Sequence, residues 1–319
     1  MKLPEDILIL DDTKALLSRA LVPNAPKVTS LPLAQARRMV EGSVELLDLP
    51  TPELARVESF SIPGPTQGSE IPVRLYDPSG TGTAGPVMVY FHGGGWVFGS
   101  LISHNALCAE IALRLGLRVL AVDYRLAPEH PFPAALEDGA AAVAWVASQP
   151  IPLLGEATGI ILAGDSAGGN IAAVLSQQLA GTLSLPLLAQ LLLYPAVDMI
   201  GSYPSAAQFA KGFMLDEEDL LFFTRSYLPK RAMRADVRVS PLLAEDLTGQ
   251  PPTLVFTSGL DPLRDQGRAY AEKLAGFGVP VHHEEAQGQV HGCFNMRKAV
   301  PSAQAQLLRC LDIFSGMVQ

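Results

Sequence analysis

Short, continuously apolar runs alternate with helical stretches along most of this 319-residue chain. The runs lie at residues 87–91, 119–122, 159–163, 189–194 and 253–257. Strands that lack a polar face are buried on both sides, as they are in parallel sheets covered by helices. The pattern therefore predicts an α/β fold with a mostly parallel central sheet and helices on both of its faces.

The remaining elements are predicted from periodicity and turn signals. Two segments with alternating apolar residues, separated by a turn rich in proline and glycine, predict strands at residues 57–62 and 71–76. A further strand is expected at residues 281–285. Apolar residues at helical spacing predict helices at residues 11–17, 33–47, 104–115, 134–147, 169–175, 216–227, 263–275 and 302–314.

One interval breaks the alternation and divides the chain. Residues 196–238 contain a helical stretch but no buried run, so we interpret them as an insertion above the sheet, where ligand sites lie in open α/β folds. The amphipathic segment 1–52 is expected to join this insertion as a helical cap. The α/β core would then comprise residues 53–195 and 239–319.

Composition excludes several classes of protein. The net charge of −9 argues against nucleic acid as a partner, because phosphates require clustered Lys and Arg. No uninterrupted apolar run reaches membrane-spanning length, and residues 7–10 are too short for the core of a signal peptide. Cys108, Cys293 and Cys310 show no metal-ligand spacing. We therefore expect a cytoplasmic protein without metal, other cofactor or stable membrane association.

A serine stands between the third buried run and the helix that follows it. Residues 164–168 read Gly-Asp-Ser-Ala-Gly, the G-x-S-x-G pattern of a nucleophile elbow, which requires a strand before it and a helix after it. Flanking glycines allow backbone to approach backbone in such a sharp turn. The pattern also occurs by chance, and many serines between glycines lie in ordinary turns. Its context nevertheless favours Ser166 as a nucleophile.

A glycine loop directly follows the first buried run. Residues 92–96 read His-Gly-Gly-Gly-Trp, and their backbone N–H groups are free to approach a ligand closely. In acyl transfer such donors must face the oxygen that becomes negative in the tetrahedral intermediate. Gly93, Gly94 and Gly95 are the candidates, with two of the three donating, and Ala167 supplies the remaining N–H. The alternative is a flexible turn without function.

A serine nucleophile requires a base, and the chain has six histidines. His291 lies in a loop after the last predicted strand and precedes a glycine. A single loop histidine is usually only a surface residue, but the order serine, acid, histidine favours this one. The other five are His92, His104, His130, His282 and His283.

The acid that orients the base should follow the preceding strand. Asp261 stands at the start of the loop after residues 253–257, and Asp265 lies one turn later. Asp261 also precedes a proline suited to the start of a helix, so helix capping is its alternative role. Asp265 is expected to face solvent or to pair with Arg264 or Arg268. Asp261 is therefore the preferred acid.

Taken together, five segments resemble the hormone-sensitive-lipase family of α/β-hydrolases, the bacterial carboxylesterases with an HGGG motif. The similarity extends from about residue 55 to the C-terminus. The matching segments are residues 92–96, 123–135, 164–170, 240–243 and 261–265. The resemblance implies a triad of Ser166, Asp261 and His291, an oxyanion hole from two loop glycines and Ala167, and a helical cap. It also makes a homodimer plausible.

The chain departs from the family pattern at two positions. Gln266 stands where the family usually has an acidic residue, and Cys293 stands where it usually has phenylalanine. Neither position carries a reacting group. We expect Cys293 to alter the shape or the oxidation sensitivity of the pocket wall.

The predicted function is a serine carboxylesterase that acts on short- to medium-chain esters through an acyl-enzyme intermediate. The same triad could instead cleave an amide, a lactone or an acetylated natural product. A non-catalytic small-molecule receptor is disfavoured, because such a protein would lack a member of the triad. Side chains proposed for the substrate pocket are Trp96, Phe209, Phe213, Met214, Leu215 and Cys293. Phe222 and Phe223 are further candidates, and packing of the cap on the core is the alternative role for these cap residues.

Overall fold

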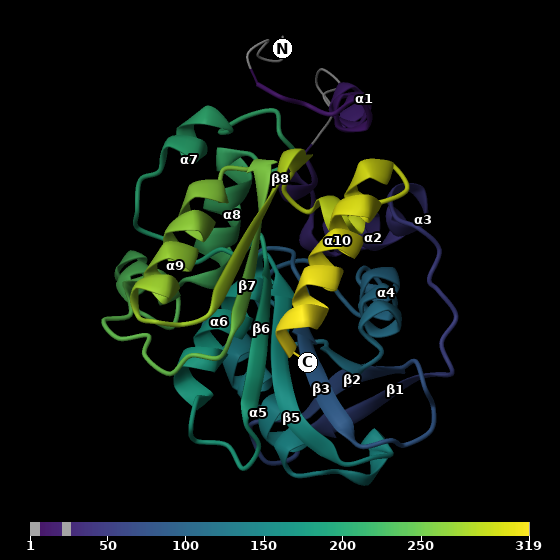
Figure 1. Ribbon diagram of the computed structural model, residues 1–319. Coiled ribbons are helices and arrows are strands. Elements are labelled where there is room, and N and C mark those ends of the chain that lie inside the picture. Colours follow the sequence, from purple (N-terminus) through teal and green to yellow (C-terminus); the bar gives the residue numbers. More distant parts are fainter. Residues whose placement is uncertain (1–6, 21–26, 319) are drawn as a thin grey trace.

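An eight-stranded sheet runs through the described part of the chain, residues 7–20 and 27–318 of the computed structural model (Figure 1). Residues 1–6 and 21–26, which the predicted N-terminal helical segment includes, lie outside the described residues, as does residue 319. The strand order is β1-β2-β4-β3-β5-β6-β7-β8. The strands are β1 (Arg56–Pro63), β2 (Glu70–Asp77), β3 (Gly85–Phe91), β4 (Arg118–Val122), β5 (Ala157–Asp165), β6 (Leu187–Leu193), β7 (Thr253–Leu260) and β8 (Val281–Val290).

The sheet is parallel except at one edge. Strand β2 pairs antiparallel with both β1 and β4, whereas every pairing from β4 through β8 is parallel. The antiparallel edge consists of the two segments with alternating polarity, and the parallel part consists of the apolar runs and β8. The predicted α/β fold with a mostly parallel sheet is therefore confirmed.

Helices cover both faces of this sheet, as predicted. Side chains of β3 explain why: Val87, Val89 and Phe91 belong to one buried cluster, and Met88 and Tyr90 belong to the other. Helices α5 (Ala134–Ala147), α6 (Ala167–Leu179) and α9 (Arg264–Gly276) pack on the first face, and α4 (Asn105–Leu115) and α10 (Pro301–Val318) pack on the second (Figure 1). None of the helices in the described residues has the length and apolar character needed to cross a membrane.

Most of the described α-helices agree with the predicted ones to within a few residues, but the helix predicted at residues 33–47 is divided into α2 and α3, and α7 was not predicted. They are α1 (Asp11–Ala20), α2 (Leu33–Gly42), α3 (Val44–Leu47), α4 (Asn105–Leu115), α5 (Ala134–Ala147), α6 (Ala167–Leu179), α7 (Pro204–Gln208), α8 (Glu217–Tyr227), α9 (Arg264–Gly276) and α10 (Pro301–Val318). Short 3₁₀ turns lie at η1 (Val28–Ser30), η2 (Ile151–Leu153), η3 (Arg231–Ala235), η4 (Pro241–Leu243) and η5 (Cys293–Asn295).

Strand β8 is longer than expected. The prediction ended at residue 285, but the strand continues to Val290. Its second half is rich in glutamine and glycine, so it lacks the apolar signal of a buried strand. Backbone pairing with β7 supplies the regularity instead, because Ser258 pairs with Ala286 and Leu260 pairs with Val290.

The N-terminal segment and the insertion meet above the carboxyl ends of the parallel strands. Lys27 Nζ lies 2.8 Å from Asp216 Oδ2, and the Thr29 hydroxyl donates to Asp219 at 2.7 Å. Asp216 is the N-cap residue of α8, which lies in the insertion. The two segments that we predict to form a cap are thus connected to each other.

Candidate active site

Ser166 stands at a strained bend between β5 and α6. Its φ of 53° and ψ of −116° are unusual for a residue with a side chain. Backbone segments crowd this bend, since a Cβ atom at Gly164 would lie 2.6 Å from the Phe91 carbonyl oxygen, and a Cβ atom at Gly168 would collide with the same oxygen. The two glycines are therefore required for the bend that exposes the serine hydroxyl.

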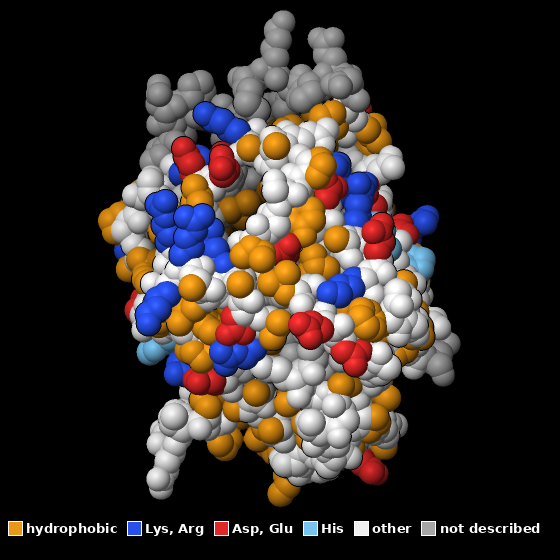
Figure 2. Space-filling view, turned by 90° about the vertical axis from the view of Figure 1, so that its left-hand side faces the viewer, with side chains coloured by type: hydrophobic (Ala, Val, Ile, Leu, Met, Phe, Trp, Pro, Cys, Tyr) orange, Lys and Arg blue, Asp and Glu red, His pale blue; other side chains and the backbone are white. Residues whose placement is uncertain are grey.

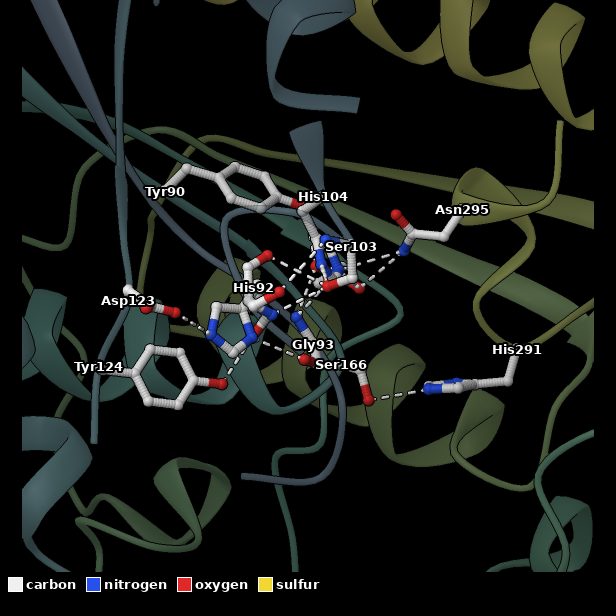
Figure 3. Close-up of polar contacts among 12 residues, drawn as sticks. Tyr90, His92, Gly93, Ser103, His104, Asp123, Tyr124, Ser166, His291 and Asn295 are labelled. Carbon is white, nitrogen blue, oxygen red and sulfur yellow. Dashed lines mark hydrogen bonds and ion pairs between the residues drawn. The ribbon is translucent and has the colours of Figure 1, made fainter. Parts of the chain in front are cut away.

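Three side chains from distant parts of the sequence form one hydrogen-bonded row. The Ser166 hydroxyl lies 2.8 Å from His291 Nε2 (Figure 3). On the other side of the ring, His291 Nδ1 lies 2.7 Å from Asp261 Oδ2. Since a carboxylate only accepts, His291 Nδ1–H donates to it, which leaves Nε2 as the acceptor for the serine hydroxyl. This arrangement makes a serine nucleophilic.

Asp261 combines the two roles that the sequence left open. It is fully buried, in the loop between β7 and α9. While Oδ2 receives the imidazole N–H, Oδ1 accepts the backbone N–H of Leu263 at 2.8 Å. Capping of the following turn fixes the orientation of the carboxylate toward His291.

The glycine loop presents two free donors rather than three. The Gly93 N–H donates to Asp165 Oδ1 at 2.8 Å, so of the three candidate glycines it is the one whose N–H is already occupied. The N–H groups of Gly94 and Gly95 have no hydrogen-bond acceptor among the described residues. Ala167 is the first residue of α6, and an N–H at this position has no acceptor within its helix.

The other histidines do not contact Ser166. His92 and His104 are buried behind the glycine loop, and Nδ1 of His92 lies 2.8 Å from the Gly93 carbonyl oxygen. His283, on β8, contacts the Thr257 hydroxyl at 2.9 Å. Burial lowers the pKa of His92 to about 3, so this imidazole is neutral at physiological pH.

A large cavity lies above the serine. Its volume is about 1170 Å³, and Ser166, His291 and the glycine loop form part of its wall. Trp96, Met214 and Leu215 line it as predicted, and so does Phe223. Figure 2 shows a hollow in this part of the surface, with hydrophobic side chains inside it and charged side chains at its edge.

Four residues proposed for the pocket are not among the described residues that line the cavity: Phe209, Phe213, Phe222 and Cys293. Phe222 is partly buried and packs against Phe98 and Phe223. Phe209 and Phe213 are buried and pack edge to face at 5.0 Å, with the Arg264 guanidinium over the Phe209 ring. Cys293 is also buried, and its Sγ lies 3.8 Å from the Ser258 hydroxyl. The pocket assignment of Phe209, Phe213 and Cys293 was wrong, because these side chains fill the interior behind the wall.

Part of the cavity wall was not predicted in detail. The N-terminal segment contributes Leu17, Val28, Val40, Val44 and Leu47. The amphipathic spacing of this segment indicated an apolar face, but it did not indicate which surface that face covers.

Gln266, one of the departures from the family pattern, supports the cavity from below. Its Oε1 accepts the backbone N–H of Val197 at 2.6 Å and that of Asp198 at 2.9 Å. A carboxylate could accept the same two bonds, so the amide preserves this function. Asp265 pairs with Arg264 at 2.8 Å and Arg268 at 3.2 Å, one of the alternatives expected for it.

Comparisons with known proteins agree on one family. The family described as alpha/beta hydrolase fold matches residues 88–295. Carboxylic ester hydrolase LipN of Mycobacterium tuberculosis is 42% identical over 256 residues, which are 78% of this chain and 67% of that protein. Ethyl acetate hydrolase of Pseudomonas putida is 36% identical over 282 residues, 87% of this chain and 88% of that protein. An ester hydrolase from the metagenome of Lake Arreo, solved with a bipyridine phosphonate derivative, has a TM-score of 0.90 and 35% identity, covering 97% of this chain and 99% of that one.

Proposed function

The chain belongs to the hormone-sensitive-lipase-like family of α/β-hydrolases and is a carboxylic ester hydrolase. We propose that it cleaves esters with a triad of Ser166, His291 and Asp261. The observation that carries the proposal is the continuous hydrogen-bonded row from Ser166 through His291 to the buried Asp261. It ends at a serine hydroxyl that borders the cavity.

The first half of the reaction forms an acyl-enzyme. His291 Nε2 removes the hydroxyl proton as Ser166 Oγ attacks the ester carbonyl carbon, and the carbonyl oxygen becomes negative. The N–H groups of Gly94, Gly95 and Ala167 stabilise this oxygen. Loss of one such donor typically costs about 10²–10³ in rate. The protonated imidazole then gives its proton to the departing alcohol as the tetrahedral intermediate collapses.

The second half repeats these steps with water in place of Ser166. His291 removes a proton from the water, which attacks the acyl carbonyl, and the carboxylic acid product leaves as Ser166 Oγ regains a proton. Asp261 stabilises the imidazolium in both halves and keeps Nδ1 protonated. Its hydrogen bond from Leu263 prevents the carboxylate from turning away.

The cavity supports short- to medium-chain esters as substrates. Its described lining is rich in apolar side chains, and residues of the N-terminal segment and of the insertion form part of its wall. A volume of about 1170 Å³ is slightly above the range of most small-molecule sites, about 300–1,000 Å³. The ethyl acetate hydrolase relative, by its name, acts on a short ester.

Replacement of the serine tests the mechanism. Ser166→Ala is expected to lower kcat for p-nitrophenyl butyrate by at least about 10⁴-fold and to abolish covalent labelling by a fluorophosphonate. Ser148→Ala, a change at the exposed serine that ends α5, serves as the control and should behave like wild type. Near-normal turnover by Ser166→Ala would rule the mechanism out.

The same assay, extended to other substrates, tests the substrate class. Acetate, butyrate and hexanoate esters of p-nitrophenol should be cleaved with higher kcat/KM than the palmitate ester. Anilides and lactones of matching chain length should be poorer still. A preference for palmitate, or for an amide or lactone, would contradict the proposed substrate class and leave the triad mechanism intact.

A further inference from the structure

A buried carboxylate that the proposed reaction does not use lies next to the nucleophile. Asp165 is the last residue of β5 and is only 2% exposed. Its Oδ1 accepts the Tyr90 hydroxyl at 2.8 Å and the Gly93 N–H at 2.8 Å. Its Oδ2 lies 3.3 Å from His104 Nε2 and 3.4 Å from Asn295 Nδ2. Each carboxylate oxygen is thus surrounded by donors.

These donors come from four separate segments. Tyr90 is on β3, Gly93 is in the glycine loop, His104 directly precedes α4, and Asn295 is in η5, just beyond the proposed base. Figure 3 shows the four residues converging beside the nucleophile. A single side chain therefore joins the strand that leads into the glycine loop, the loop itself and the segment that carries the base.

The carboxylate is ionised in this position. Burial by itself would raise the pKa of Asp165, but the charge and hydrogen bond of His104 and the hydrogen bond of Tyr90 bring that pKa below its ordinary value. A buried charge without such partners would be strongly unfavourable. The donors are therefore matched to an acceptor that offers two oxygen atoms, and the site is built around it.

The bond to Gly93 determines where the next two residues lie. Gly94 and Gly95 follow directly, with positive φ angles of 115° and 61°, and a glycine-rich loop has little conformational preference of its own. Asp165 is covalently attached to Ser166, and Ala167 follows. The Asp165 side chain therefore sets the distance between the N–H groups of Gly94 and Gly95 and the N–H group of Ala167, which lies on the other side of the oxyanion position.

We propose that Asp165 is a positioning residue, which holds the glycine loop in register with the nucleophile through the Gly93 N–H. This role rests on the proposed triad mechanism and adds to it. The acceptor oxygen, not the negative charge, performs it, since an anion behind the loop would oppose the developing oxyanion. An asparagine at position 165 should therefore perform the same role, because its Oδ1 can accept hydrogen bonds from both Gly93 and Tyr90.

Three variants test this role with p-nitrophenyl butyrate. Asp165→Ala is expected to lower kcat by about 10²-fold, the typical effect of a displacement of about 1 Å in catalytic groups, with KM within about threefold of wild type, since the acceptor acts in the transition state. Asp165→Asn should restore kcat to within about tenfold of wild type, because asparagine keeps Oδ1 as the acceptor for the Gly93 N–H and changes only Oδ2, which lies toward His104 and Asn295, into an NH2 group. Tyr90→Phe is the matched control: it removes another buried hydrogen bond of the same oxygen and should retain most of kcat.

A tetrahedral inhibitor separates positioning from a general loss of structure. A butyl trifluoromethyl ketone adds reversibly to Ser166 and places a negative oxygen between the loop donors and Ala167. Its Ki should rise in Asp165→Ala by the same factor by which kcat/KM falls, and Asp165→Asn should reverse both changes. If Asp165→Ala does not fold, Asp165→Ser, whose hydroxyl is one atom shorter, takes its place with the same expectation.

Three results would overturn the proposal: wild-type kcat in the folded alanine or serine variant, no recovery with asparagine, or an equal loss in Tyr90→Phe. Wild-type turnover and fluorophosphonate labelling of Ser166 are measured alongside. An active, labelled wild type with an unimpaired Asp165→Ala overturns the positioning role alone and leaves the triad mechanism standing.

Discussion

Gln266 illustrates how one side chain can accept the hydrogen bonds of backbone N–H groups that a bend in the chain leaves without a backbone partner. The chain turns after β6, and the consecutive N–H groups of Val197 and Asp198 have no backbone acceptor among the described residues. Gln266 is 5% exposed and its Oε1 accepts both of them. Buried backbone donors without a partner are costly, so this residue supports the floor of the cavity without taking part in the reaction.

The effect of substituting Gln266 on stability should therefore depend on whether the new side chain still offers an acceptor oxygen to Val197 and Asp198. Gln266→Leu leaves two buried N–H groups unpaired and is expected to lower the free energy of unfolding by about 2 kcal/mol or more. Gln266→Glu keeps an acceptor oxygen in the same place and should lose much less. Urea denaturation of the two variants measures the difference, and equal stabilities would contradict this role for Gln266.

Among the elements, the N-terminal segment has one buried ion pair among its contacts with the rest of the molecule. Asp48 follows α3, and its carboxylate receives Arg297 Nε at 2.7 Å and Nη2 at 2.9 Å. Both side chains are almost fully buried, with Glu110 at 3.7 Å from the same guanidinium. The pair joins the end of the proposed N-terminal cap segment to the loop before α10.

Removal of one partner of this pair should be strongly destabilising. Asp48→Ala leaves the Arg297 charge buried and largely unpaired, and a loss of about 3–5 kcal/mol in the free energy of unfolding is expected. The control is Asp312→Ala, which breaks the exposed pair of Arg114 and Asp312 between α4 and α10 and should cost no more than about 1 kcal/mol. Chemical denaturation of both variants measures the contrast, and similar losses would argue against the buried anchor.

For the molecule as a whole, buried neutral groups influence how stability depends on pH. His92 stacks on Tyr124 at 4.2 Å and is only 3% exposed. Burial, and then the charge of His104, lowers the pKa of His92 to about 3 from an ordinary value of 6.5. Between these pH values the unfolded chain binds a proton that the folded chain does not, so folding becomes less favourable as the pH falls.

The size of this effect can be measured with a variant that does not titrate. The free energy of unfolding should fall by up to about 1.4 kcal/mol per pH unit below pH 6.5 because of His92 alone. Between pH 7 and pH 5, wild type is therefore expected to lose about 2 kcal/mol more than His92→Asn does. Urea denaturation of both proteins at the two pH values gives this difference, and parallel losses would show that His92 is protonated in the folded state.

Local sequence was sufficient to predict most of the elements and the proposed reacting groups. The apolar runs predicted the parallel strands because a strand buried on both faces must be apolar throughout. The elbow around Ser166 was recognisable because backbone crowding admits only glycine at Gly164 and Gly168. Chain order alone then led to Asp261 and His291, which the structure brings to within hydrogen-bond distance of each other.

Assignments that depend on which surface a side chain faces could not be predicted in this way. Phe209, Phe213 and Phe223 are aromatic residues in the same insertion, yet only Phe223 lines the cavity among them. Likewise, nothing in the three-glycine loop distinguishes Gly93 from its neighbours until Asp165 is seen to occupy its N–H. Such differences arise from contacts between segments far apart in the chain.

The sequence by itself determined the class of fold, the bend at Ser166 and the identity of the groups available for ester cleavage. Only the tertiary structure decided which glycines keep free donors, which residues form the cavity, and that Asp165 joins four segments beside the nucleophile. The physical reason is one of range. Backbone geometry and burial of a strand are set by near neighbours in the chain, whereas hydrogen-bond partners and cavity walls are set by packing between distant elements.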